Sequence, residues 1–249
     1  MNCLLRIRIL VASLVLAVLA SNSLVMAQQK SAKKAAKKAR AANPSLEQIQ
    51  DQPGLPRVLL IGDSISIGYT VSVREMLKGE ANVHRIPVNG GPTTNGLRNL
   101  TSWLGDSKWD VIHFNWGLHD LKYVGPDGTS LVDPKSPGAH PQVPLPEYEE
   151  NLRKLVDQLR KTGARLIWCN TTPVPAGASG RVPGDEQKYN EAAARVMQGA
   201  GVTTNDLHRH AQAKLKDVQR PENVHFTDEG SKYLAEQVVT AIRQALAKK

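Results

Sequence analysis

A serine and a histidine from opposite ends of the chain supply the residue types needed for nucleophilic catalysis. Ser64 lies in a Gly-Asp-Ser segment that directly follows the apolar run ArgValLeuLeuIleGly at 57–62. A serine at the turn from a strand into a helix has its hydroxyl near the helix N-terminus at the carboxyl edge of the sheet, which suits a nucleophile. The same serine could instead serve as an ordinary helix N-cap, so this motif alone leaves both roles open.

The candidate base lies near the end of the chain, in ProGluAsnValHisPhe at 221–226. His225 lies just before the last predicted helix, and Glu222 is three residues earlier. A serine nucleophile needs a base within hydrogen-bond reach and a group that orients that base. The sequence therefore predicts that His225 activates Ser64 and that Glu222 orients His225.

The elements that must position these residues alternate between strand and helix. Short apolar, β-branched runs bounded by Pro or Gly predict strands, and the longer periodic segments between them predict helices. Connections of this length predict a parallel sheet with helices on both faces. The strands are expected at 57–62, 82–88, 109–116, 165–170 and 202–205, and the helices at 68–78, 94–104, 146–161, 185–198 and 228–247.

Two long loops interrupt this alternation. Residues 117–146 and 171–184 are rich in Gly, Pro, Ser and Asp, and each follows a predicted strand. In open α/β sheets, ligands bind just beyond the carboxyl ends of the strands. We therefore expect the loop 117–146 and the ThrThrProValPro segment at 171–175 to form the walls of a polar, shallow site.

Four short segments together resemble the blocks of the SGNH (GDSL-type) hydrolase family, in the family's order. The resemblance covers about residues 56–247 and implies a flavodoxin-like α/β/α sandwich with a mostly five-stranded parallel sheet. It also implies that Ser64 is the nucleophile of an enzyme that hydrolyses ester bonds. The matching segments are GlyAspSer (62–64), ValAsnGlyGlyProThrThrAsnGly (88–96), GlyLeuHisAsp (117–120) and GluAsnValHis (222–225).

The resemblance also implies an oxyanion hole. Its donors would be the backbone N–H groups of Ser64 and Gly91, with Gly90 as the alternative to Gly91. The third donor would be the side chain of His119, which stands where the family has asparagine. A neutral imidazole can donate one hydrogen bond, so this exchange is compatible with the role. The alternative is that His119 is a structural histidine bonded to a nearby carbonyl.

Glu222 marks a second departure, because it stands where the family has aspartate. It could still orient His225, or a backbone carbonyl could do so. Asp63 and Asp120 are candidate supporting residues next to Ser64 and His119. The two departures also leave open a protein that has lost catalysis.

The function implied by the resemblance is acyl transfer through serine, with neither a metal nor another cofactor. We expect an acetyl or other short-acyl ester of a small molecule or polysaccharide, with carbohydrate favoured. The remaining alternatives are a lysophospholipase or thioesterase, an acyltransferase, and a non-catalytic glycan-binding module. His208 and His210 lie two residues apart, a spacing at which helical side chains diverge, so they do not predict a metal site.

The N-terminus has the pattern of a secretory signal peptide. Two arginines precede an apolar run from Ile9 to Ala20, and small residues precede a cleavage site after Ala27. The alternative is an uncleaved membrane anchor. The sequence therefore predicts a secreted or periplasmic protein with a signal peptide at 1–27, a disordered basic linker at 28–53 and a catalytic domain at 54–249.

The basic charge is concentrated in the N-terminal segment. The whole chain has 32 Lys and Arg against 23 Asp and Glu, a net charge of +9, but residues 1–40 contain eight of the basic residues and no acid. The remainder is nearly neutral, which excludes a broad surface for nucleic acid. The basic arm at 30–40 could make weak electrostatic contact with anionic envelope surfaces. Cys169, the one cysteine after residue 27, lies in an apolar run and is expected to be structural.

Overall fold

The computed structural model describes residues 43–247. The expected signal peptide and the basic arm lie outside the described residues. Residues 45–249 form one compact unit, so its boundary differs from the expected start at residue 54. Ser45 is buried and its hydroxyl donates to Ile67 O over 2.7 Å, while Gln52 N donates to Asn82 Oδ1 over 2.8 Å. Polar hydrogen bonds attach this segment, although its sequence has no apolar stripe.

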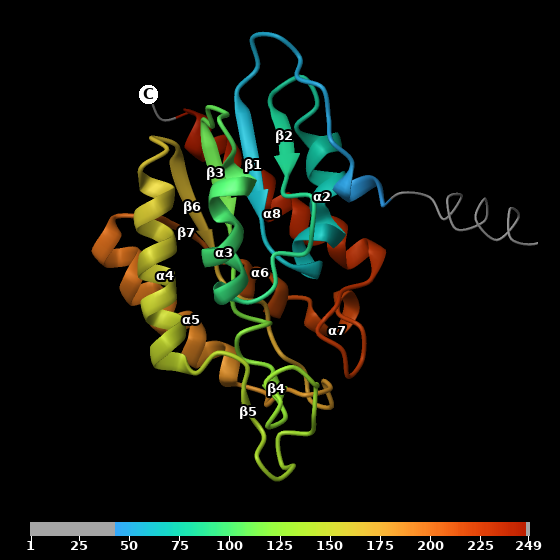
Figure 1. The fold of residues 1–249 in the computed structure, drawn as a ribbon. Coiled ribbons are helices and arrows are strands. Elements are labelled where there is room, and N and C mark those ends of the chain that lie inside the picture. Colours follow the sequence, from blue (N-terminus) through green and yellow to red (C-terminus); the bar gives the residue numbers. More distant parts are fainter. Residues whose placement is uncertain (1–42, 248–249) are drawn as a thin grey trace, which may run out of the picture. The chain divides into compact units, whose positions relative to one another are not determined.

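A five-stranded parallel sheet forms the centre of this unit, as expected (Figure 1). Its strand order is β2-β1-β3-β6-β7, which is the flavodoxin-like order. The chain reverses its direction of winding between β1 and β3, so their carboxyl ends border the crevice in which such folds bind ligands. The strands are β1 (Arg57–Ile61), β2 (Asn82–Arg85), β3 (Val111–Phe114), β6 (Arg165–Cys169) and β7 (Thr203–Asn205).

Helices cover both faces of the sheet (Figure 1). The helices α2 and α8 pack together on one face, and α4 packs between α3 and α5 on the other. The fold prediction is therefore confirmed. These helices are α2 (Ser64–Met76), α3 (Thr93–Leu104), α4 (Leu145–Arg160), α5 (Asp185–Ala200) and α8 (Asp228–Ala247).

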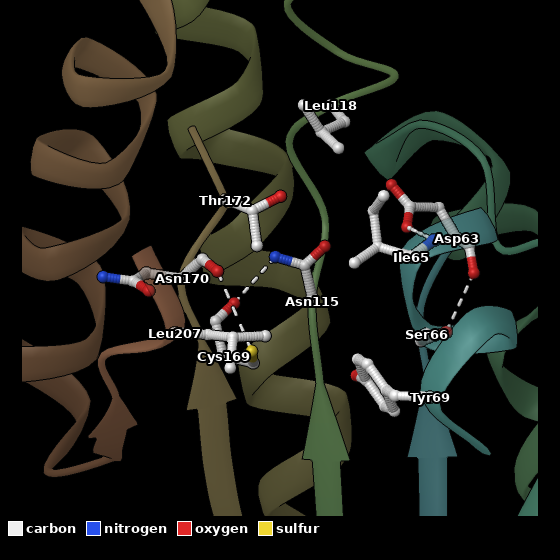
Figure 2. A pocket seen from close by; sticks show the side chains of 10 residues that line it. All are labelled: Asp63, Ile65, Ser66, Tyr69, Asn115, Leu118, Cys169, Asn170, Thr172 and Leu207. Atoms are coloured by element: carbon white, nitrogen blue, oxygen red, sulfur yellow. Dashed lines mark hydrogen bonds between the residues drawn. The ribbon is translucent and has the colours of Figure 1, made fainter. Parts of the chain in front are cut away.

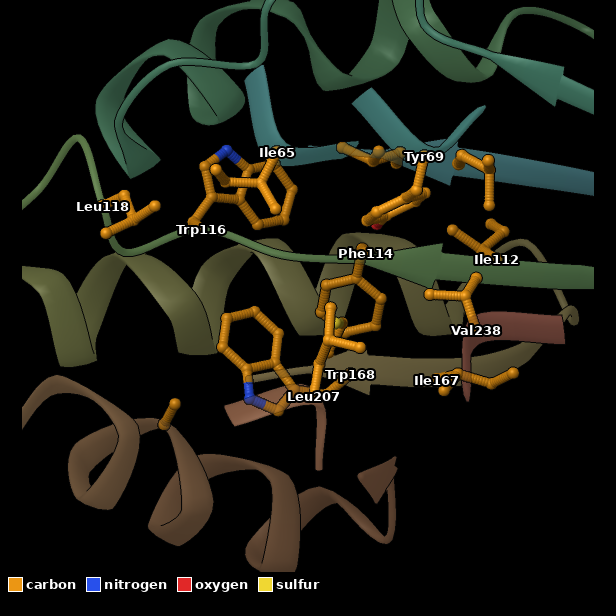
Figure 3. Packing of buried hydrophobic residues seen from close by; sticks show 14 of the residues in the cluster. Ile65, Tyr69, Ile112, Phe114, Trp116, Leu118, Ile167, Trp168, Leu207 and Val238 are labelled. Atoms are coloured by element: carbon orange, nitrogen blue, oxygen red, sulfur yellow. The ribbon is translucent and has the colours of Figure 1, made fainter. Parts of the chain in front are cut away.

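The core is built from strands that are buried on both faces. All four residues of β3 are buried, as are four of the five in β1, which explains why these strands are apolar apart from His113 and the half-buried Arg57. Aromatic rings fill the space near the carboxyl ends (Figure 3). The Phe114 ring lies 5.4 Å from that of Trp168 and 6.1 Å from that of Trp116 between ring centroids. This packed layer supports the loops that carry the candidate site.

Short elements within the loops were not expected from sequence. The strands β4 (Tyr123–Val124) and β5 (His140–Pro141) pair within the long loop that follows β3. The other short elements are η1 (Pro44–Leu46), α6 (Leu207–Gln212) and α7 (Leu215–Val218). In the part of the chain that the structure describes, no helix is long and apolar enough to span a bilayer.

Candidate active site

Ser64 and His225 are 161 residues apart in sequence and meet at the carboxyl end of the sheet. Ser64 Oγ lies 2.9 Å from His225 Nε2. Ser64 is the first residue of α2, and His225 lies in the loop before α8. Because α2 and α8 pack against each other, the fold itself brings the two side chains together. This distance is within the range for proton transfer from a serine hydroxyl to a histidine.

Asn223 determines which nitrogen of His225 carries the proton. Asn223 Oδ1 accepts the backbone N–H of His225 over 3.0 Å and lies 2.7 Å from His225 Nδ1. A backbone N–H can only donate, so the Asn223 atom must be the acceptor oxygen and Nδ1 must carry the hydrogen. Nε2 is therefore unprotonated in the neutral ring and accepts the hydroxyl hydrogen of Ser64. The ring is in the tautomer that a general base needs.

Glu222 does not occupy the orienting position that the sequence predicts for it. Its φ is +52°, in the left-handed region, and its side chain lies over Gly177 in the loop that follows β6. A Cβ at Gly177 would lie 2.7 Å from Glu222 Cγ. This backbone conformation directs Glu222 toward the loop, and the adjacent Asn223 makes the contact with His225 instead.

The turn that carries Ser64 is held by a local cap. Asp63, and not Ser64, is the N-cap of α2, and its carboxylate accepts Ile65 N over 2.9 Å. This cap explains why the helix begins four residues earlier than expected. Because Asp63 provides the cap, the Ser64 hydroxyl is free to contact His225. Within residues 43–247, the backbone N–H of Ser64 has no acceptor.

Gly90 and Gly91 have different hydrogen-bond partners. The N–H of Gly90 donates to Gly62 O over 2.9 Å, and a Cβ at Gly90 would lie only 2.9 Å from that oxygen. Gly90 therefore permits close contact between its loop and the nucleophile turn. The N–H of Gly91 donates to the side chain of Asn89 over 2.9 Å at an exposed position. Of the two glycines, Gly91 is the one whose donor could be transferred to a ligand.

His119 is half-buried in the turn after β3, and Asp120 fastens that turn to α3. Asp120 Oδ1 accepts Thr93 N over 2.8 Å and Thr93 Oγ1 over 2.6 Å. Asp120 is fully buried, which raises its pKa to about 7. Arg181 donates from Nε and Nη2 to Leu118 O over 3.2 and 3.0 Å. The residues on both sides of His119 are thus fixed to other elements.

The electrostatic environment favours neutral rings in both histidines. Burial lowers the pKa of His225, the nearby charges of Arg181 and Arg220 lower it further, and the carboxylate of Asp63 opposes them. Burial also lowers the pKa of His119, with the same opposition from Asp63. The charges of Lys122, Arg181 and His225 lower the pKa of His119 further. At neutral pH, His225 is a base and His119 has one N–H to donate.

A small cavity lies beside the nucleophile turn, between the start of α2 and the ends of β3 and β6 (Figure 2). Its volume is about 10 Å³, which is room for about one water molecule. The side chains of Ile65, Leu118 and Thr172 line it. Burial raises the pKa of the Cys169 thiol, which also lines this cavity, so the thiol is protonated at neutral pH.

Metal-binding side chains do not cluster in the described part of the chain. Within residues 43–247, no group of three His, Cys, Asp or Glu side chains could hold a metal ion. His208 instead lies 3.5 Å from the carboxylate of Glu186, and the His210 ring stacks on that of Tyr233.

Sequence reasoning missed two residues of this site, Asn223 and Arg85. An Asn two residues before His225 could have been found, because Asn side chains commonly accept the backbone N–H two residues later. Arg85 lies within the predicted strand at 82–88, and no sequence motif indicates that it contacts the nucleophile turn.

The fold and the paired serine and histidine are typical of α/β hydrolases that act through serine. Residues 60–233 match the model of the GDSL-like Lipase/Acylhydrolase family, and the chain belongs to this family. The resemblance to SGNH (GDSL-type) hydrolases is thereby confirmed, and the chain is by class a hydrolase of ester bonds.

A curated relative and two solved structures agree with this assignment. "GDSL esterase/lipase At5g62930" of Arabidopsis thaliana is 25% identical over 143 residues, which are 49% of this chain and 58% of that protein. The chain therefore matches less than two thirds of that relative's length. An acetyl xylan esterase, AlAXEase, superposes with a TM-score of 0.61 at 15% identity, covering 75% of this chain and 99% of that chain. The lipase/acylhydrolase from Enterococcus faecalis superposes with a TM-score of 0.63 at 17% sequence identity. This match covers 76% of this chain and 96% of that chain. At these identities, the two structures show a shared fold.

Proposed function

We propose that the protein is an exported serine esterase that removes acetyl or other short acyl groups from carbohydrate esters. The observation that carries the proposal is the line of contacts from Ser64 Oγ to His225 Nε2 at 2.9 Å and from His225 Nδ1 to Asn223 Oδ1 at 2.7 Å. A nucleophile, a base in the correct tautomer and a group that orients the base are the parts needed for acyl transfer through serine.

In the proposed reaction, His225 Nε2 takes the proton from Ser64 Oγ as that oxygen attacks the ester carbonyl. The tetrahedral intermediate collapses to an acyl-serine, and His225 donates the proton to the departing alcohol. A water molecule then gives its proton to His225 and attacks the acyl-serine. His225 then returns this proton to Ser64 Oγ as the bond from that oxygen to the acyl carbon breaks, which releases the carboxylic acid and restores the hydroxyl.

The developing oxyanion requires hydrogen-bond donors. The Ser64 N–H has no acceptor within the described chain, and the Gly91 N–H is held only by the exposed Asn89 side chain. We assign these two donors to the oxyanion hole, together with the neutral ring of His119. In this assignment, the substrate oxygen displaces Asn89 from Gly91. Each such donor contributes on the order of 10²–10³ in rate.

The preference for short acyl groups is supported by the composition of the loops that follow β3 and β6. Their Gly, Pro, Ser and Asp content favours a polar, shallow site over a long apolar tunnel. The carbohydrate part of the proposal is supported by the similar fold of a protein described as an acetyl xylan esterase.

The test compares p-nitrophenyl acetate, butyrate and octanoate with acetylated xylan, followed by labelling with a fluorophosphonate. We expect turnover to fall from acetate to octanoate, and mass spectrometry to find the label on Ser64. The Ser64→Ala variant should lose turnover and label, whereas Ser107→Ala, at an exposed position before β3, should keep both. Equal turnover by wild type and Ser64→Ala would refute the enzyme proposal in favour of a binding module, and a preference for octanoate would indicate a lipid substrate.

Export is proposed from the sequence pattern of residues 1–27 alone. We expect the protein purified from its natural source, outside the cytoplasm, to begin at Gln28. N-terminal sequencing tests this directly. A mature chain that begins at Met1 in the membrane fraction would show an uncleaved anchor instead.

A further inference from the structure

Arg85 joins the nucleophile turn to the loop that carries Gly90 and Gly91. It is the last residue of β2, and only 3% of its surface is exposed. Its Nη1 donates to Ile86 O over 2.9 Å and to Val88 O over 2.8 Å. Its Nη2 shares its hydrogens among three acceptors: Gly62 O at 2.9 Å, Asp63 O at 3.0 Å and Ser66 Oγ at 2.7 Å. One guanidinium therefore contacts both segments that hold the backbone oxyanion donors.

The positive charge of Arg85 is retained without an ion pair in the described part of the chain. Burial lowers its pKa to about 10, so it remains charged at neutral pH. The nearby Asp63 uses its carboxylate to cap α2, and it is the Asp63 carbonyl oxygen that accepts from Arg85. A buried cation is costly unless its environment compensates it, and here backbone carbonyl groups do so. A structural link between two loops would not itself require a charge at this position.

The Asp63 carbonyl and the Ser64 N–H belong to the same peptide group. A cation that donates to the carbonyl oxygen draws electron density toward that oxygen, and this strengthens the N–H at the other end as a donor. The second carbonyl bound by Arg85, that of Gly62, also accepts the N–H of Gly90. The same side chain thus polarises the first oxyanion donor and fixes the loop that holds the second.

We propose that Arg85 is a positioning residue for the oxyanion hole, which strengthens the Ser64 N–H and holds Gly91 at the correct distance from it. This inference rests on the proposed esterase function. Because an oxyanion exists only near the transition state, Arg85 should affect kcat and leave KM nearly unchanged.

The test measures kcat, KM and the inhibition constant of an alkylboronic acid for wild type, Arg85→Lys and Arg85→Met. A boronic acid forms a tetrahedral adduct with the nucleophilic serine and so reports on the oxyanion hole. We expect kcat to fall about 10-fold in Arg85→Lys and about 100-fold in Arg85→Met, with KM within about twofold, since a donor is weakened and not removed. The inhibition constant should rise in proportion to the loss in kcat/KM.

Arg74 provides a matched control. It donates from Nε to Val83 O within β2 over 3.0 Å and from Nη2 to Glu47 O over 3.0 Å, so these two bonds are also made to backbone carbonyls, and both carbonyls lie outside the nucleophile turn. Arg74→Met should lower the melting temperature and leave kcat within about twofold. If Arg85→Met does not fold, Arg85→Gln, which removes the charge but keeps side-chain donors, decides the question.

Two outcomes would overturn the inference. If folded Arg85→Met or Arg85→Gln keeps the wild-type kcat and boronate inhibition, Arg85 is only structural, while the esterase function stands. If wild type has no Ser64-dependent turnover, the proposed function fails and this inference fails with it.

Discussion

The two halves of the candidate catalytic pair are held in different ways. The nucleophile half, residues 62–66 with the Gly90–Gly91 loop, is fixed by buried contacts from Arg85 and by the close approach of Gly90 to Gly62. The base half, residues 221–226, has its orienting hydrogen bonds at an exposed position, where Asn223 accepts both the backbone N–H and the ring of His225.

This difference follows from what each half must do. The oxyanion donors must keep a fixed geometry while charge develops, and a buried charged network resists displacement. The base must take and return a proton, and a local turn is sufficient to keep its ring in one tautomer. We therefore expect the nucleophile half to be sensitive to small changes. In the base half, changes around His225 should cost far less activity than the loss of His225 itself.

The largest effect is expected from removing either member of the pair. Ser64→Ala and His225→Ala should each lower kcat by on the order of 10⁴–10⁶, and the double variant should be no worse than either one, because the two side chains act as a unit. Single-turnover and steady-state kinetics on p-nitrophenyl acetate measure this. Additive losses in the double variant would show that the two residues act separately.

The next effect tests the donor at His119. His119→Ala should lower kcat by about 10²–10³ with little change in KM, because the ring is expected to contact the oxyanion only near the transition state. His119→Asn should recover part of the loss by restoring a side-chain donor. Full activity in the alanine variant would assign His119 to a structural role.

A smaller effect is expected at the base half, and here the sequence and the structure disagree. Asn223→Ala should lower kcat by about 10–100-fold, less than the loss of a buried charged orienting group costs. Glu222→Ala should remain within about threefold, because its side chain lies on Gly177 and not on His225. Equal losses in the two variants, measured at one pH with matched melting temperatures, would restore Glu222 as the orienting group.

The smallest expected effect is a change in pH dependence, caused by the charge of Asp63 in the nucleophile half acting on His225 in the base half. Its carboxylate raises the pKa of His225, whereas burial lowers that pKa below 6.5, so the acid limb of kcat/KM should lie below pH 6.5 in wild type. Asp63→Asn keeps an N-cap for α2 but removes the charge. The protonated ring is then less favoured, so activity should persist to lower pH in the variant. An acid limb that does not move between pH 4 and 8 would show that Asp63 has no electrostatic effect on the base.

The sequence by itself determined the order of strands and helices, and through four short motifs it indicated the family, Ser64 and His225. These features are local, because apolar periodicity and turn residues act within a few positions of the chain. Only the tertiary structure placed Asn223, and not Glu222, against His225, and gave Gly90 and Gly91 different hydrogen-bond partners. These differences depend on the direction in which each group points once the chain is folded. The left-handed φ of Glu222 turns its side chain away from His225, and the N–H of Gly90 is already bonded to Gly62 O. The role proposed for Arg85 could not be predicted from sequence for the same reason, because it depends on carbonyl groups 22 and 23 residues away along the chain.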